Sequence, residues 1–141
     1  ANMPMRPDGM YGVSKCFGES LSRYYYDRFG IETVCIRIGS SFPEPVNKRM
    51  MVTYFSYNDL LELLRCAVFT PRVGHTISFG VSNNPASWWD NRYAAHLGFQ
   101  AKDSSAAFAH KFPDSGEYPQ NDDITTIYQG GAFLLTGPQY K

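Results

Sequence analysis

Hydrophobic positions in the first part of the chain recur with the period of an α-helix. Between residues 8 and 29, large apolar side chains are separated by three or four positions: Val13, Phe17, Leu21 and Tyr24. This spacing places them on one face of a helix, and we expect that face to turn toward the core. Asp8 and Gly9 give a start signal and Gly30 gives a stop signal, so the predicted helix spans residues 8–29.

Two later stretches have the composition of strands in a parallel sheet. Residues 31–38 (IETVCIRI) are dense in β-branched side chains, which predicts a strand that is buried on both faces. Residues 76–79 (TISF) predict a second, shorter strand. Residues 51–55 (MVTYF), which lie between them, are expected to be short and extended.

Three further segments are predicted to be helical. Residues 59–69 follow a possible cap at Ser56 or Asn58 and carry an apolar stripe. The stripe consists of Leu60, Leu63, Leu64, Ala67 and Val68. Pro85 can open a helix that runs through Trp88, Trp89, Tyr93 and Leu97. Residues 103–112 predict a further short helix.

The alternation of helix and strand predicts an α/β fold. This order is typical of half of a parallel, doubly wound sheet. No glycine-rich loop follows a strand and no acidic residue is placed to hold an adenosine ribose. We therefore expect the C-terminal part of a Rossmann-like domain in residues 1–112, without its glycine-rich N-terminal part. Residues 113–141 are predicted to be an irregular tail that folds back on the domain.

Composition narrows the possible partners. The 141 residues contain 13 basic and 13 acidic side chains, so no overall charge attracts nucleic acid or an anionic membrane. No apolar run is long enough for a bilayer, and the N-terminus does not have the composition of a signal peptide. The three cysteines and three histidines are scattered, which predicts reduced thiols, no metal site and a cytoplasmic location.

Candidate chemistry begins with Tyr11 and Lys15. These residues are four positions apart, so a helix places them on the same face. A lysine ammonium beside a phenol favours the phenolate, which can accept a proton from a hydroxyl group. A tyrosine and lysine at this spacing are also common by chance, so the pair gains weight only from its context. Gly39 and Ser40 supply context, because ligands of open α/β sheets bind beyond the carboxyl ends of strands.

Four motifs give the chain a resemblance to a known family. They are RPDGMYGVSKCFGE, RIGSSFPEPVNKRM, WWDN and QGGAF, and they span residues 6–133. In this order they are similar to the second half of the extended short-chain dehydrogenase/reductases and, among these, to uronate dehydrogenases. The resemblance implies NAD-dependent oxidation of a hexuronate, such as glucuronate or galacturonate, at its anomeric carbon to give an aldarolactone.

The resemblance also implies roles for particular residues around the cofactor. Tyr11 matches the catalytic base, and Lys15 matches the lysine that favours the phenolate and holds the nicotinamide ribose. Ile38, Gly39 and Ser40 match the strand end that lines the nicotinamide.

On the substrate side, Ser40 also matches a residue that lines the sugar. Arg49 matches the arginine that binds the substrate carboxylate, and Phe133 matches an aromatic side chain that closes over the site. The family's catalytic serine, glycine loop and acidic ribose contact would all precede Ala1, so we expect half of the cofactor site to lie outside this chain.

Two alternatives stay open. The chain resembles, more distantly, half of a sugar-nucleotide epimerase or dehydratase, although residues 113–141 make a short nucleotide-binding domain. It is also compatible with a non-enzymatic remnant that acts as an interaction domain. In each case the strand of residues 31–38 would lack one neighbour, and we expect a homo-oligomer or pairing with an N-terminal half.

Overall fold

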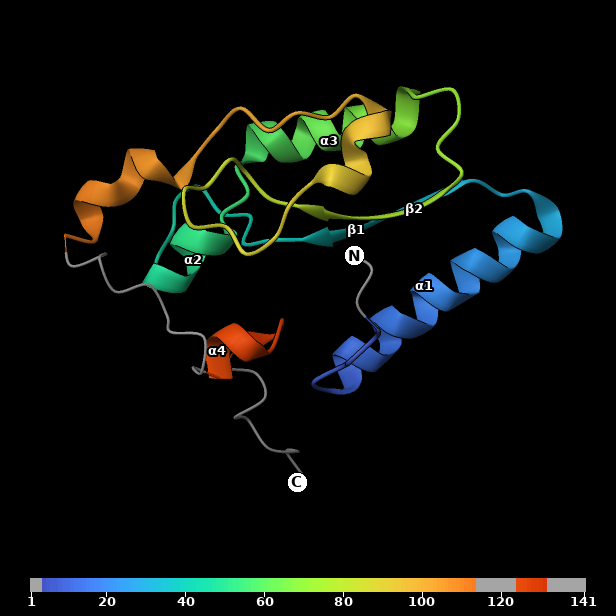
Figure 1. Ribbon diagram of the computed structural model, residues 1–141, viewed down its shortest axis with the longest axis horizontal. Helices are drawn as coiled ribbons and strands as arrows, with labels where there is room; N and C mark the ends of the chain where they lie inside the picture. The colour runs from blue at the N-terminus through green and yellow to red at the C-terminus, as the bar shows by residue number, and fades with distance from the viewer. Residues whose placement is uncertain (1–3, 114–123, 132–141) are drawn as a thin grey trace.

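The computed structural model describes residues 4–113 and 124–131, which form an α/β arrangement (Figure 1). The elements are α1 (Met10–Phe29), β1 (Thr33–Ile38), α2 (Lys48–Thr53), α3 (Tyr57–Phe69), β2 (His75–Gly80), the 3₁₀ helices η1 (Arg92–Leu97) and η2 (Ser105–Lys111), and α4 (Ile124–Ile127). Within these described ranges, no helix has both the length and the apolar character that crossing a membrane requires.

The two predicted strands pair with each other in parallel. Thr33 lies opposite His75 and Ile38 lies opposite Gly80, so all six residues of β1 face partners in β2. The prediction that β1 is buried on both faces is wrong for this chain. Its residues are half-buried, and Ile38 is 52% exposed. The reason is that, among the described residues, β1 has a neighbouring strand on one side alone.

The apolar core lies on the α3 face of the sheet. Buried Phe55, Leu63, Cys66, Ala94, Leu97 and Phe99 form one cluster, and Val34 and Ile36 of β1 pack against it. Ser56 caps α3 by accepting a hydrogen bond from the Asp59 amide at 3.0 Å, as predicted. The predicted stripe is only partly correct, since Leu64 and Val68 are 42% and 73% exposed.

The opposite face of the sheet is covered by α1, and its contacts are polar. The Arg37 guanidinium donates two hydrogen bonds of 2.8 Å to the Glu19 carboxylate. Ser22 Oγ lies 2.9 Å from His75 Nε2. The predicted apolar face is on the helix but does not face the core. Its four members, Val13, Phe17, Leu21 and Tyr24, are 41–67% exposed.

Two other local predictions are wrong. Residues 51–55 were expected to be extended, but α2 occupies most of them, because the Asn47 side chain caps the helix by accepting from the Met50 amide at 2.9 Å. The helix expected from Pro85 begins only at Arg92, and as a 3₁₀ helix.

The helix expected from Pro85 begins late because two asparagine side chains bind backbone groups elsewhere in the chain. The Asn84 amide donates to the carbonyls of Val52 and Tyr54, and Asn91 binds both backbone groups of Val81. These side-chain bonds to distant backbone hold residues 84–91 in an irregular path.

Candidate active site

The residues that follow β1 are held closely by the end of α2 and the end of β2. Gly39 donates its N–H to the Gly80 carbonyl at 2.9 Å, and Ser40 donates to the Thr53 carbonyl at 2.7 Å. A Cβ at position 39 would lie 2.3 Å from the Thr53 oxygen and 2.9 Å from Val81 Cγ1. Only glycine fits there, which lets the two chain segments approach. The predicted site segment is therefore rigidly placed at the carboxyl edge of the sheet.

Ser40 takes part in this packing with its side chain as well. Its hydroxyl lies 2.8 Å from Thr53 Oγ1, and its carbonyl accepts the Phe55 amide at 3.0 Å. Ile38, two residues earlier, is half exposed at the same end of the sheet. The strand end therefore carries one exposed apolar side chain and, two positions on, one hydroxyl.

Tyr11 and Lys15 lie together in the first turns of α1, as their spacing predicts. The Lys15 ammonium lies 4.8 Å from the centre of the Tyr11 ring. The Tyr11 side chain is 76% exposed, so its phenol is open to a molecule that approaches from outside. The arrangement places an exposed phenol, a group able to exchange a proton with a hydroxyl, beside a cation that lies over its ring.

Arg49 is the charged group of α2 that faces the segment 124–131. Its Nε donates to the Thr125 carbonyl and its Nη2 donates to the Gln129 carbonyl, both at 2.8 Å. The guanidinium carbon also lies 6.0 Å from the centre of the Trp88 ring. Burial lowers the pKa of Arg49 from its usual value, and the nearby Asp8 carboxylate opposes this. An arginine keeps its charge through such a change, so Arg49 remains a cation able to bind an anion.

The same segment also reaches the start of α1. Gly130 donates its N–H to Asp8 Oδ2 at 2.7 Å, and the Arg6 guanidinium carbon lies 5.3 Å from the centre of the Tyr128 ring. Figure 1 shows α4 next to α2 and to the N-terminal end of α1. These contacts bring the helix of Tyr11 and the helix of Arg49 to one region, whereas Phe133 lies outside the described residues.

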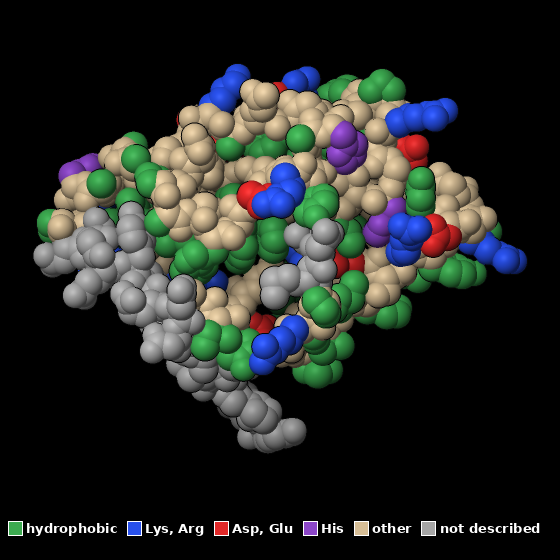
Figure 2. Space-filling model, in the orientation of Figure 1, with side chains coloured by type: hydrophobic (Ala, Val, Ile, Leu, Met, Phe, Trp, Pro, Cys, Tyr) green, Lys and Arg blue, Asp and Glu red, His purple; other side chains and the backbone are tan. Residues whose placement is uncertain are grey.

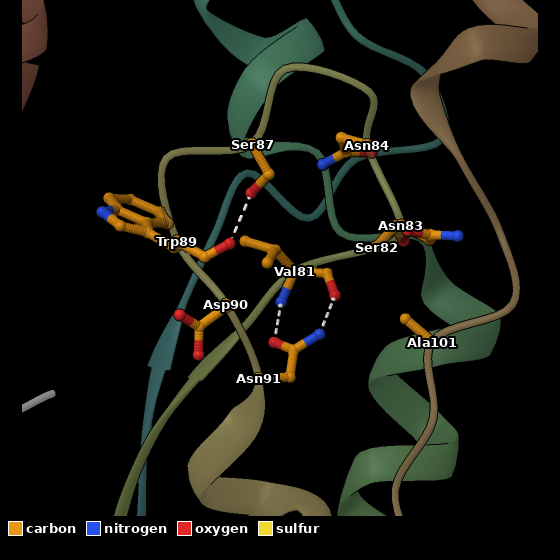
Figure 3. Close-up of a pocket in the computed structure, with 9 residues that line it drawn as sticks. All are labelled: Val81, Ser82, Asn83, Asn84, Ser87, Trp89, Asp90, Asn91 and Ala101. Carbon is orange, nitrogen blue, oxygen red and sulfur yellow. Dashed lines mark hydrogen bonds between the residues drawn. The ribbon is translucent and has the colours of Figure 1, made fainter.

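A separate hollow of about 320 Å³ lies beyond the carboxyl end of β2 (Figure 3). Its wall includes Val81, Ser82, Trp89, Asp90 and Asn91. Sequence reasoning gave Asn91 no role, although its side-chain amide fixes the Val81 backbone at 3.1 and 2.8 Å. Asn91 is the last residue of the WWDN motif, and that motif is the feature of the sequence that could have pointed to it.

Two other predictions concern cysteine and metal chemistry. Cys16, Cys35 and Cys66 are free thiols in the structure. Burial raises the pKa of the Cys66 thiol, which keeps it protonated at neutral pH. Across residues 4–113 and 124–131, the His, Cys, Asp and Glu side chains form no group of three that suits a metal ion.

Two parallel strands with helices on both faces are part of a Rossmann-like α/β fold. No family model matches the chain. The uronate dehydrogenase of Pseudomonas putida is 54% identical over 138 residues, covering 98% of this chain and 51% of that protein.

Solved structures of dehydrogenases are also similar to this chain. The glucuronic acid dehydrogenase of Chromohalobacter salexigens has a TM-score of 0.87 at 45% identity over 96% of this chain and 51% of that one. A mutant uronate dehydrogenase of Agrobacterium tumefaciens complexed with NAD has a TM-score of 0.86 at 43% identity, over 99% of this chain and 52% of that one. The chain spans about half the length of these relatives and is homologous to the C-terminal half of the uronate dehydrogenases.

Proposed function

We propose that this chain carries the catalytic half of an NAD-dependent uronate dehydrogenase. The reaction would oxidise a hexuronate, such as glucuronate or galacturonate, at its anomeric carbon to an aldarolactone. The observation that carries the proposal is the 54% identity to the Pseudomonas putida enzyme over 98% of this chain. The positions of Tyr11, Lys15 and Arg49 support it, since a base and a carboxylate-binding cation approach one region from two helices.

In this proposal Tyr11 is the base. Its phenolate takes the proton of the anomeric hydroxyl, the C–H bond at that carbon breaks, and a C=O bond forms. When bound, NAD⁺ supplies the acceptor for the hydride, so two electrons leave the sugar with that hydrogen. The Lys15 ammonium lies 4.8 Å from the centre of the Tyr11 ring, on the same side of the helix as the base. Its N–H donors suit the hydroxyl groups of the nicotinamide ribose.

The residues at the end of β1 fit the nicotinamide end of such a cofactor. Ile38 offers an exposed apolar surface for a flat ring, and Gly39 keeps the backbone close to the sheet. Ser40 would line both the nicotinamide and the sugar. The sequence provides no glycine-rich loop for the pyrophosphate. We therefore assign this chain the nicotinamide and substrate sides of the site.

Arg49 would bind the carboxylate of the uronate. A guanidinium carries five N–H donors, so binding a carboxylate is compatible with the two carbonyl contacts it already makes. Phe133 would close over the bound sugar. We further propose that residues 1–112 are the catalytic half, that residues 113–141 fold back on it, and that the protein acts in the cytoplasm. The chain would work as a homo-oligomer or with an N-terminal half.

The test is a fusion. The part of the Pseudomonas putida enzyme that this chain does not match is joined to the N-terminus of the chain, and NADH formation is followed by absorbance. We expect oxidation of glucuronate and galacturonate. A fusion that binds NAD but oxidises neither uronate would refute the proposal, and turnover of a sugar nucleotide instead would favour the epimerase or dehydratase alternative.

A further inference from the structure

The Asp8 carboxylate lies at the start of α1, where its Oδ1 would be 3.4 Å from a Cβ at Gly12. Gly9, which occupies the N-cap position of α1, makes no side-chain cap, and the sequence marks Asp8 as a start signal for that helix. In the structure, Asp8 Oδ2 instead accepts the Gly130 N–H at 2.7 Å, across 122 positions of the chain. The carboxylate therefore serves a long-range contact.

The close approach of Gly130 to Asp8 depends on the absence of a side chain at position 130. A Cβ there would lie 2.3 Å from Asp8 Oδ2 and 2.9 Å from its Cγ, so the carboxylate would have to move away. The φ angle of Gly130 is not in the left-handed region, so a substitution would act through this contact and not through backbone strain.

Arg49 and Asp8 hold the two ends of one peptide group. The Gln129 carbonyl accepts from Arg49 Nη2 at 2.8 Å, and the N–H of the same peptide bond, at Gly130, donates to Asp8. The N–H and C=O of a trans peptide point in opposite directions, so a carboxylate and a guanidinium face opposite ends of one dipole. Charged partners strengthen each of these hydrogen bonds, and polarisation along the series strengthens them further.

We propose that Asp8 is a positioning residue for Arg49, acting through the peptide group between Gln129 and Gly130. The inference rests on the proposed function, in which Arg49 binds the substrate carboxylate. Asp8 lies three positions before Tyr11, so the series Asp8–peptide–Arg49 connects the helix of the base to the carboxylate-binding cation. In the ring form of a hexuronate, the reacting C1 and the carbon that carries the carboxylate lie on the two sides of the ring oxygen. The series thus sets the distance between the two groups that must reach these two positions.

The first arm of the experiment measures amide hydrogen exchange in residues 124–131 of the full chain. The variants are Asp8→Ala, Asp8→Asn, Gly130→Ala and the control Asp27→Ala, whose carboxylate pairs with Arg23 at the other end of α1. We expect about tenfold faster exchange in Asp8→Ala and Gly130→Ala, because one hydrogen bond is lost. Asn keeps an acceptor oxygen, so Asp8→Asn should stay close to the parent, as should the control. Unchanged protection in Asp8→Ala would overturn the proposal.

The second arm uses the fusion with the remaining half of the Pseudomonas putida enzyme. We expect Asp8→Ala to raise KM for glucuronate about fivefold or more, while kcat stays within about twofold and KM for a neutral aldohexose is unchanged. Asp8→Asn should restore most of the lost affinity. A fall in kcat for both substrate classes would indicate a general structural role and overturn the proposal. A parent fusion inactive on uronates would refute the proposed function, whereas the exchange measurement would still decide whether Asp8 holds the segment.

Discussion

Tyr11 and Arg49 differ in how they are surrounded, and this decides how substitutions at each should act. Tyr11 is 76% exposed and has the Lys15 ammonium against its ring. Arg49 is half-buried and hydrogen-bonded to two backbone carbonyl groups of another segment. Removing a polar atom from Tyr11 should therefore alter chemistry alone, whereas a change at Arg49 should also alter packing.

Tyr11→Phe is expected to abolish turnover in the fused enzyme while NAD affinity stays nearly intact. The phenyl ring keeps its place over Lys15 but loses the oxygen that accepts the proton. Steady-state kinetics and NAD titration by calorimetry are the measurements. Activity within tenfold of the parent, a barrier change of only ~1.4 kcal/mol, would show that another group is the base.

Arg49→Lys is expected to weaken uronate binding more than its retained charge implies. Lysine loses the planar fork, and a hydrogen bond to a charged group contributes about 1.5–3 kcal/mol. KM should rise about tenfold or more for glucuronate and change little for a neutral aldohexose, which has no carboxylate. Equal losses on the two sugars would mean that Arg49 serves only to hold residues 124–131.

Contacts between individual residues could be predicted from the sequence where the two residues lie close together in the chain. The four-residue spacing of Tyr11 and Lys15 predicted their contact, because one helix fixes both. The bonds from Arg49 to Gln129 and from Asp8 to Gly130 span 80 and 122 positions. No local periodicity contains such information, so neither contact was predicted.

At the scale of elements, Gly39 after β1 and Gly18 within α1 differ in the space around them. Gly39 follows β1 directly where two chain segments touch, and a Cβ there would meet the Thr53 carbonyl at 2.3 Å. Gly18 lies within α1, and a Cβ there would meet nothing within 4 Å. The two positions therefore form a matched pair for substitution by alanine.

Gly39→Ala is expected to destabilise the chain by about 2 kcal/mol or more, because the backbone of two segments would have to separate. Gly18→Ala should stabilise it by about 0.5–1 kcal/mol, since alanine is the better helix former. Urea unfolding followed by circular dichroism gives both values. A neutral Gly39→Ala would contradict the close packing described at the site edge.

The same elements show where a hydrophobic pattern misleads. Apolar spacing located α1 and α3 within two residues at each end, and β-branched density located β1 and β2. It did not give the orientation of α1, because the helix meets the sheet through polar residues such as Glu19 and Ser22. A pattern of apolar positions assumes that the apolar face is the buried one, and that assumption failed here.

At the scale of the whole molecule, apolar surface is left open on α1 and along β1. Figure 2 shows hydrophobic side chains gathered along the margin of the molecule where α1 runs. Phe17 and Leu21 are 67% and 41% exposed. Ile31 before β1 and Ile38, its last residue, are also exposed, and among the described residues β1 pairs with β2 alone. Such a strand edge is a template for pairing with another chain.

We expect the isolated chain to associate at micromolar concentration and to bind NAD negligibly. Sedimentation velocity should show species larger than a monomer, and Phe17→Lys should shift them toward the monomer. Val46→Lys, at a loop position that is 65% exposed, is the control and should change little. A monodisperse monomer that binds NAD would show that the chain is complete as a cofactor-binding unit.

The polar contact between α1 and the sheet restricts the rotation of α1 about its own axis. Apolar contacts have no preferred direction, whereas the paired bonds between Glu19 and Arg37 require one direction at each atom. Rotation of α1 about its axis would move the Glu19 carboxylate away from Arg37 and break both bonds. Tyr11 is eight positions from Glu19 along this stiff rod. In the proposed function, the angle at which its phenol meets a bound sugar therefore depends on an ion pair two turns away.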